Sequence, residues 1–200
     1  MRSFKDTLVR LYRPPKLIAS CSFTDWPLLE RIAEAEKPVI ASTAGAYLEE
    51  IDRVVSFFIH RGVQLTIMHC VAEYPTPDEH LNLARIPLLK ERYKDIDIGY
   101  STHENPNRTE PVMLAVAMGA KVFEKHVASR YSKKSPDFKF SLFEDQIGLY
   151  RKCLDETYEM FRKKKFYRNK SESFYKKFRR SIYTINDIRK GELFSNKNIK

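Results

Sequence analysis

The fold is decided by the stretch KPVIASTAGAYLEEIDRVVSFFIHRGVQLTIMHC, from Lys37 to Cys70. Two apolar runs in it, Pro38–Ser42 and Val63–Cys70, have the length and composition of buried strands. Between them, Leu48–Ile59 has its apolar residues at helical spacing, and Thr43 stands where a helix cap is expected. A strand, a helix and a second strand joined by short loops predict parallel strands with a crossover helix.

The same alternation extends to both sides of this stretch. Further strands and helices are expected at seven segments: Leu17–Ser20, Trp26–Ala35, Asn82–Tyr93, Ile96–Tyr100, Pro111–Met118, Lys121–Val127 and Leu142–Lys163. Five evenly spaced strand–helix units without a GxGxxG loop favour part of a (β/α)8 barrel over a dinucleotide-binding fold. Because such a barrel closes with eight strands and about 250 residues, we expect an α/β chain that forms an incomplete TIM barrel.

The composition is that of a globular protein, with 42% hydrophobic and 31% charged residues. The longest apolar run, Val112–Ala120, is too short to span a bilayer, and the N-terminal residues contain no signal-peptide core. The three cysteines are widely spaced and indicate reduced thiols rather than disulfides or a zinc site. These features predict a cytoplasmic protein.

The net charge of +10 is concentrated at the C-terminal end, where residues 151–200 hold 16 Lys and Arg against 6 Asp and Glu. A basic tail is able to bind nucleic acid or an anionic membrane. An isolated charge run carries little specificity, so a solvated helix end and linker is the favoured interpretation. A nucleic-acid-binding module ranks last among the possible functions, and no membrane association is expected.

Several histidines follow predicted strands, and the carboxyl ends of barrel strands line the active site. His103 and His126 come after neighbouring strands, so their imidazoles are expected to meet over one barrel mouth. Imidazoles suit divalent Mn, Fe, Zn or Ni, and the two therefore predict a metal site. His69 also ends a strand, but a single strand-end histidine is more often a hydrogen-bonded structural residue. His60 falls on a helix and is given no role.

Small hydroxyl side chains also stand at strand ends, at Ser20, Ser42 and Ser101. They are able to hold phosphate or carboxylate oxygens, and they are equally able to start a loop or cap a helix. Asp137 and Lys139 lie in the loop after the fifth strand and are candidates to close over a ligand, since loops often carry function.

Seven segments form a recognisable set of motifs: IASCSFTDWPLLE (Ile18–Glu30), KPVIASTAGAYLEEI (Lys37–Ile51), HCVAEYPTP (His69–Pro77), GYSTH (Gly99–His103), GAKVFEKHV (Gly119–Val127), PDFKFSL (Pro136–Leu142) and RRSIYTINDIRKGE (Arg179–Glu192). Together, in this order, they resemble the sialic acid synthase family, whose members make N-acetylneuraminate and other nonulosonic acids. The last resembles the beginning of the family's antifreeze-like (SAF) domain. The resemblance implies a partial TIM barrel at 1–163, a basic linker at 164–178 and a truncated SAF domain at 179–200.

The family's enzymes condense phosphoenolpyruvate with an N-acetylated amino sugar such as N-acetylmannosamine, and phosphate leaves. They use a divalent metal, Mn or Mg, and are usually domain-swapped homodimers. The resemblance therefore implies a homo-oligomer or a complementing chain as partner. By resemblance, His103 and His126 would bind the metal, and the catalytic residues would be Asp137, which supports the metal-bound water or the sugar, and Tyr74, which lies by the sugar. Ser20, Ser42 and Ser101 would hold the phosphate and carboxylate of phosphoenolpyruvate, and Lys139 is a further expected substrate-binding residue.

The chain also departs from the family pattern. The first three strands of the family's barrel have no counterpart in this sequence. Leu17 stands where the family has a substrate-binding Lys, and Ser22 stands where the family has an acidic residue. Thr102 replaces the Asp of the SDH motif. Loss of an acid weakens proton transfer. Two hypotheses follow: an enzyme that another chain completes, or a catalytically inactive remnant or regulatory paralogue.

Overall fold

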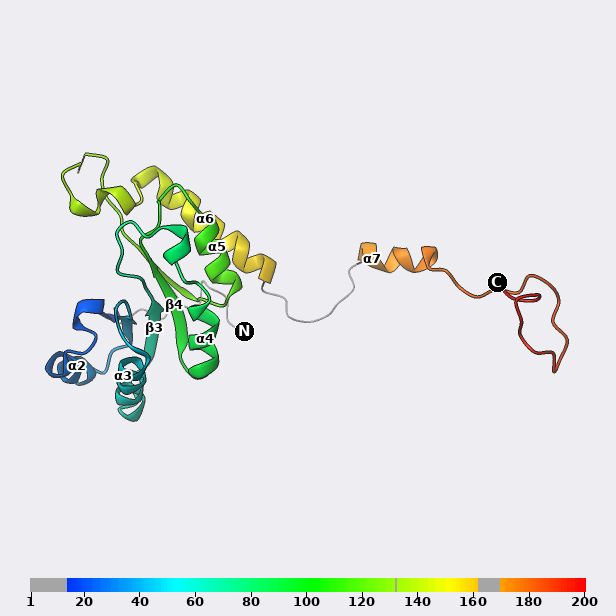
Figure 1. The fold of residues 1–200 in the computed structure, drawn as a ribbon, viewed down its shortest axis with the longest axis horizontal. Coiled ribbons are helices and arrows are strands. Elements are labelled where there is room, and N and C mark those ends of the chain that lie inside the picture. The colour runs from blue at the N-terminus through cyan, green and yellow to red at the C-terminus, as the bar shows by residue number, and fades with distance from the viewer. Residues whose placement is uncertain (1–13, 132, 162–169) are drawn as a thin grey trace. The chain divides into compact units, whose positions relative to one another are not determined.

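The computed structural model describes residues 14–131, 133–161 and 170–200 (Figure 1). The chain divides into two compact units, Met1–Arg162 and Lys163–Lys200. Within the described ranges, no helix is both long and apolar enough to cross a membrane.

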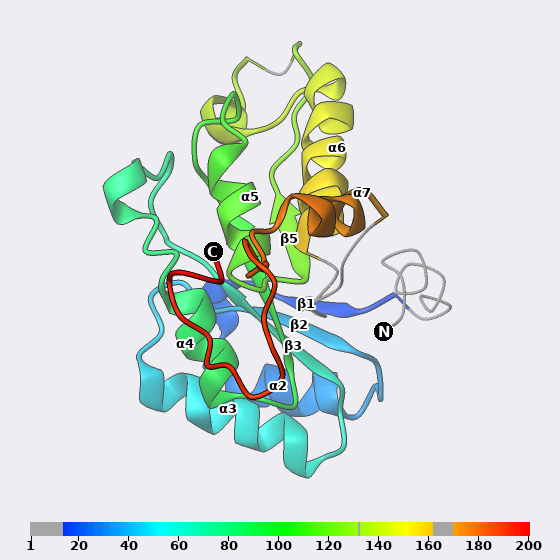
Figure 2. The same ribbon diagram turned by 90° about the vertical axis from the view of Figure 1, so that its right-hand side faces the viewer.

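The first unit is built on a five-stranded parallel sheet. Its strands lie in chain order, each hydrogen-bonded to its successor: β1 Lys16–Ile18, β2 Val39–Ser42, β3 Leu65–His69, β4 Asp97–Thr102 and β5 Val122–Lys125 (Figure 2). A parallel sheet in which every strand pairs with the next along the chain is the arrangement of a (β/α) barrel. The sheet is half of such a barrel, which confirms that part of the expected fold.

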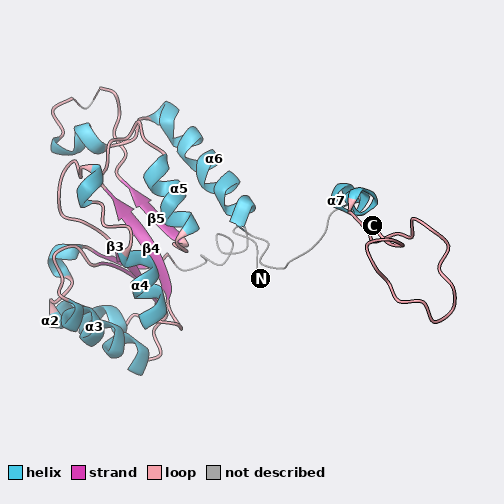
Figure 3. Cartoon of the chain, turned by 45° about the vertical axis from the view of Figure 1, so that its right-hand side comes forward, coloured by secondary structure: helices cyan, strands magenta, loops and turns pink. Residues whose placement is uncertain are grey.

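Helices follow the strands in the predicted alternation and lie around them (Figure 3). They are α2 Trp26–Ala33, α3 Leu48–His60, α4 Arg85–Arg92, α5 Glu110–Ala117 and α6 Glu144–Phe161. Short 3-10 helices occur after three strands, at Ser20–Ser22 (η1), Asp78–His80 (η2) and Pro136–Phe140 (η3). The expected end of the last helix at Lys163 lies outside the described residues.

The fourth predicted helix begins later than the periodicity indicates. Asn82 was expected to open it, but its φ is +46°. This left-handed conformation is incompatible with a right-handed helix, so α4 begins only at Arg85. The residues before it form η2 and a turn, which carry the chain from β3 to the helix.

The core lies on the helix-facing side of the sheet. One row of paired residues, Ile18, Ala41, Ile67 and Ile98, crosses four strands, and every member is at most 2% exposed. Side chains alternate between the faces of a strand, so the neighbouring row, which begins at Leu17, faces the barrel interior. Leu17 is 63% exposed, because in this half-barrel the described strands leave that end of the interior face uncovered.

The second unit contains the helix α7 Lys170–Phe174, the 3-10 helix η4 Tyr175–Phe178 and one antiparallel bridge, Thr184 to Ile199. Residues 170–178, which belong to the expected basic linker, are helical. A turn is present at residues 190–191, with a φ of +89° at Gly191. A single bridge does not show a SAF domain, so that assignment stays a prediction.

Candidate functional site

Two imidazoles meet beyond the ends of β4 and β5. The ring centroids of His103 and His126 are 5.1 Å apart, at an interplanar angle of 52°. The ladder between the two strands ends with the pair Thr102 and Lys125, one residue before each histidine. Adjacent strands in register thus carry the two rings to the same edge of the sheet.

The orientation of His103 is set by a backbone contact. Its Nδ1 lies 2.9 Å from the carbonyl oxygen of Val71. Because a carbonyl only accepts, Nδ1 carries the proton and Nε2 keeps its lone pair. Burial lowers the pKa of His103, and the nearby charges of His126 and Lys125 lower it further. Neutral imidazole with Nε2 unprotonated is the form that binds a metal.

His126 faces an acidic side chain from the following loop. Its Nδ1 is 3.6 Å from Oδ2 of Asp137, which belongs to η3. Backbone hydrogen bonds hold this loop to the strand end, since Leu142 donates to the carbonyl of His126 (2.8 Å) and Ala128 donates to that of Leu142 (2.9 Å). Asp137, predicted from its place in a loop and from the family resemblance, therefore lies beside one of the two rings.

Aromatic rings surround the imidazole pair. The ring centroid of Tyr74 is 4.2 Å from that of His103. Phe140 contacts His103, His126 and Tyr74, with ring centroids at 5.8, 5.0 and 5.3 Å. Phe140 is 3% exposed, whereas Tyr74 is half-exposed. Phe140 was not predicted, because a phenylalanine has no polar group that indicates chemistry, although it lies in the PDFKFSL segment.

The predicted serines lie along the strand ends of the same sheet. Ser20 Oγ accepts a hydrogen bond from the Ala44 amide (3.2 Å), and Ser101 Oγ donates to Glu124 Oε1 (3.3 Å). The Cys70 thiol adjoins both hydroxyls. Burial raises the pKa of Cys70, and the hydrogen bonds with Ser101 and Ser20 oppose this rise. Glu124 was missed, although strand alternation places it on the face of His126, two residues away.

The other two predicted substrate-binding residues differ in exposure. Ser42 ends β2 and is buried, opposite Met68 of β3. Lys139 is exposed on η3, in the same 3-10 helix as Asp137.

His69 has the surroundings of a structural residue. It is fully buried, its Nε2 donates to the Leu81 carbonyl (2.8 Å), and its ring stacks on Tyr100 with centroids 5.9 Å apart. Tyr100 belongs to the core cluster on the helix-facing side of the sheet. His69 therefore points away from the imidazole pair and anchors the loop after β3.

His103 and His126 at the barrel mouth are able to serve as two ligands of one divalent metal ion. Imidazole nitrogens are ligands of divalent transition-metal ions, and the Nδ1 contact of His103 leaves its Nε2 available. Among the described residues there is no group of three or more His, Cys, Asp and Glu side chains that would form a metal cage. A two-histidine site leaves coordination positions for water or substrate.

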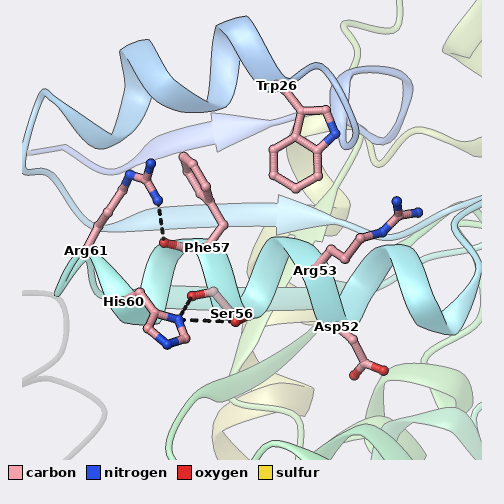
Figure 4. Close-up of a pocket in the computed structure, with 7 residues that line it drawn as sticks. All are labelled: Trp26, Asp52, Arg53, Ser56, Phe57, His60 and Arg61. Carbon is pink, nitrogen blue, oxygen red and sulfur yellow. Dashed lines mark hydrogen bonds between the residues drawn. The ribbon is translucent and has the colours of Figure 1, made fainter.

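Figure 4 shows a hollow at the outer helices α2 and α3, and its lining includes none of the site residues described above. Trp26 of α2 packs edge-on against Phe57 of α3, with centroids 5.6 Å apart, and the Arg61 guanidinium lies 3.7 Å from the Phe57 centroid. His60 bonds to the carbonyl of Ser56 on its own helix (2.7 Å). The hollow is lined by residues of α2, of α3 and of the C-cap of α3, none of which was predicted as a site residue: Trp26, Asp52, Arg53, Ser56, Phe57, His60 and Arg61.

The model of the NeuB family matches residues 5–165 of the chain, which include the whole sheet and the imidazole pair. The chain belongs to the NeuB family. The resemblance to sialic acid and nonulosonic acid synthases is thereby confirmed.

Two relatives in this family come from Campylobacter jejuni. A pseudaminic acid synthase is 35% identical over 184 residues, which cover 92% of this chain and 53% of the relative. An N,N′-diacetyllegionaminic acid synthase is 32% identical over 186 residues, covering 91% of this chain and 55% of the relative. The chain thus spans about half the length of these NeuB-family proteins.

Among solved structures, the chain is similar to a Chromobacterium violaceum protein described as spore coat polysaccharide biosynthesis protein E. The TM-score is 0.82 at 43% identity, and the match covers 100% of this chain and 60% of that one.

Proposed function

We propose that this chain supplies the metal-binding half of a nonulosonic acid synthase site. The reaction is the condensation of phosphoenolpyruvate with an N-acetylated amino sugar of the N-acetylmannosamine type, with release of phosphate. The observation that carries the proposal is the pairing of His103 and His126, 5.1 Å apart at the barrel mouth of a NeuB-family chain. Cytoplasmic carbohydrate biosynthesis is the corresponding cellular role.

His103 and His126 are the residues that would hold the metal ion, Mn or Mg. When bound, the ion supplies a Lewis acid that polarises the aldehyde of the amino sugar. The Val71 carbonyl keeps the His103 ring in one orientation, and Asp137 lies 3.6 Å from the His126 ring. We assign Asp137 the role of orienting a water or a sugar hydroxyl at this point.

Tyr74 and Phe140 shape the place where the sugar would lie. Burial raises the pKa of the Tyr74 phenol, so it stays protonated at neutral pH and is able to donate a hydrogen bond to the sugar. Phe140 packs beneath both imidazoles and excludes water from that side.

We assign the binding of phosphoenolpyruvate to the strand-end serines Ser20, Ser42 and Ser101. Lys139, in the loop after β5, is assigned to the same substrate. Hydroxyl and ammonium groups are suitable donors to phosphate and carboxylate oxygens. The cationic clamp is weaker than the family pattern because residue 17 is Leu. We therefore propose that a second chain, a copy of this one or a complementing chain, completes the barrel and the anion site.

A catalytically inactive paralogue is the second candidate. Leu17 is exposed on the interior face, at the position where the family pattern has a Lys, and Ser22 stands where it has an acid. Such a protein would keep the metal pair without turnover. Pseudaminic and legionaminic acid synthases are both similar to the chain, at 35% and 32% identity. The test of activity therefore has to include more than one amino sugar.

The proposal is tested first by Mn²⁺ binding, measured by electron paramagnetic resonance on the full chain. We expect His103→Ala and His126→Ala each to weaken Mn²⁺ binding at least about tenfold. The matched control is His60→Ala, a histidine on the outer face of α3, which should bind like the unaltered chain. Equal Mn²⁺ affinity in the unaltered chain and the His103→Ala variant would overturn the metal assignment.

Turnover separates the two candidates. The chain is co-expressed with the N-terminal half of a NeuB-family relative, and phosphate release from phosphoenolpyruvate is followed with N-acetylmannosamine and with the pseudaminic and legionaminic precursor sugars. Phosphate release that depends on one sugar and on His126 identifies an enzyme. Its absence with every sugar, together with Mn²⁺ binding, identifies the inactive paralogue.

A further inference from the structure

A buried ion pair lies directly behind the two imidazoles. Lys125 Nζ is 3.3 Å from Oε1 of Glu104, and it also donates to the backbone carbonyl of Glu104 at 2.9 Å. The Lys125 side chain is 4% exposed and that of Glu104 is 1% exposed. The ammonium thus holds both the side chain and the backbone of one residue.

Each partner of this pair is the chain neighbour of a candidate metal ligand. Glu104 follows His103, and Lys125 precedes His126. Side chains of successive residues in extended chain point to opposite faces of a sheet. The imidazoles therefore lie toward the barrel mouth, while the ion pair lies on the helix-facing side, where Tyr150 of α6 is buried beside Glu104.

The place of the pair along the ladder is informative. The hydrogen-bonded register of β4 and β5 ends at Thr102 and Lys125. His103 and Glu104 lie beyond it, so the ladder itself does not hold them against β5. The two contacts from Lys125 to Glu104 close this gap and join the ends of the two strands.

Stability alone is a poor reason for such a pair. The free-energy cost of removing two charges from water often exceeds the gain from their mutual attraction. Proteins in which apolar residues replace a buried ion pair are therefore frequently as stable as the original protein. An ammonium that donates to the backbone carbonyl of Glu104 and also lies 3.3 Å from its carboxylate does, however, fix one backbone position relative to another. The structure also offers a second place for the negative charge, because Thr102 faces Lys125 across the ladder and is 2% exposed.

We propose that Glu104 and Lys125 are positioning residues that hold the His103 and His126 rings at their mutual distance. This inference rests on the proposed function, in which the two rings bind a divalent ion. According to this inference, the geometry of the metal site depends on the buried Glu104–Lys125 pair as well as on the contacts of the two imidazole rings with Val71 and Asp137.

The test uses the full chain and Mn²⁺ titration. We expect Glu104→Gln to weaken Mn²⁺ binding about ten- to a hundredfold, the range found for residues that orient metal ligands. The charge-free double variant Glu104→Leu/Lys125→Met should remain folded, as its melting curve would show, and still bind Mn²⁺ as weakly. In the Glu104→Gln background, Thr102→Asp should restore most of the affinity by returning a carboxylate to Lys125.

A second readout does not need the metal. In nitrogen–proton correlation spectra of the metal-free chain, His103 should show a single Nδ1-protonated tautomer. Glu104→Gln should produce exchange between tautomers, and Thr102→Asp should reverse it. A merely structural role for the pair would change the melting temperature without changing the His103 tautomer.

The outcomes separate the two proposals. If His103→Ala abolishes Mn²⁺ binding while Glu104→Gln and the charge-free variant bind within twofold of the unaltered chain, the positioning role is wrong and the metal site stands. Failure of Thr102→Asp to restore affinity also contradicts the positioning role. If the unaltered chain binds no Mn²⁺, the proposed function fails; the positioning role is then decided by the metal-free spectra, and an unchanged His103 tautomer in Glu104→Gln would overturn it.

Discussion

At the scale of single residues, buried imidazoles in this chain differ in what they do. His103 turns toward the barrel mouth with Nε2 available, whereas His69, at the end of the neighbouring strand, is fully buried on the helix-facing side and donates to Leu81. Both follow strands and both have a lowered pKa because of burial. Only the direction of the side chain separates a candidate ligand from a structural residue.

The burial of His69 makes stability depend on pH. Its pKa in the folded chain is lowered mainly by desolvation, while in the unfolded chain it is about 6.5. As pH falls through this value, the unfolded chain takes up a proton that the folded chain does not, so the stability contributed by the neutral ring is complete above about pH 6.5 and is lost below it. We expect His69→Gln to flatten the decline in unfolding free energy between pH 7.5 and 5, by at most about 1.4 kcal/mol per pH unit.

Urea unfolding at several pH values measures this slope. Gln is the chosen replacement because its side-chain amide is still able to donate to Leu81. His103 contributes a slope of the same sign, so some decline should remain in the variant. An unchanged slope in His69→Gln would show that His69 is protonated in the folded chain as easily as in the unfolded one.

At the scale of elements, the strands approach one another closely at one position of β4. A Cβ added at Gly99 would overlap Met68 Sδ of β3 and lie 2.7 Å from the backbone carbonyl oxygen of Val122 in β5. The methionine is flexible, but the carbonyl belongs to the ladder and has no room to move. We therefore expect Gly99→Ala to destabilise the chain by about 1–3 kcal/mol, the usual cost of overpacking.

A glycine-to-alanine substitution at Gly148 in α6 should instead raise the stability of the chain. A Cβ at Gly148 meets no atom of the described residues within 4 Å, and alanine is favoured over glycine inside a helix by about 0.5–1 kcal/mol. Thermal melting of the two variants beside the unaltered chain measures both effects. A lower melting temperature for Gly148→Ala, or an unchanged one for Gly99→Ala, would contradict the packing of these two elements.

At the scale of the whole molecule, the half-barrel has an exposed apolar side chain on its edge strand β1. β1 pairs with β2 alone within the described sheet, and Leu17 on it is 63% exposed. Exposed apolar sheet edges promote association. We expect the chain by itself to associate in solution, and light scattering after size-exclusion chromatography to give a mass above that of one chain.

A matched pair of substitutions locates this association. Leu17→Lys and Leu88→Lys add the same charge at side chains of nearly equal exposure, 63% and 64%, but Leu88 lies on α4 rather than at the sheet edge. Leu17→Lys should reduce the associated fraction, and Leu88→Lys should leave it unchanged. A monodisperse monomer with cooperative melting for the unaltered chain would contradict the expectation.

Much of the architecture was accessible from the sequence for a local reason. Apolar periodicity and short loops act over a few residues, so they predicted five strands, their parallel direction and the placement of His103 and His126 after neighbouring strands. The helix start at Asn82 failed because a left-handed backbone conformation there is not visible in the apolar pattern. The sequence motifs also determined the NeuB family, since they depend on residue identity alone.

The tertiary structure alone decided which atoms meet. The Val71 carbonyl that orients His103, the Phe140 ring beneath both imidazoles and the Lys125 ammonium on Glu104 all come from segments remote in the chain. Such contacts depend on the register and curvature of the sheet and on how one loop folds back over it. No periodicity encodes them, because they exist only when distant elements have packed together.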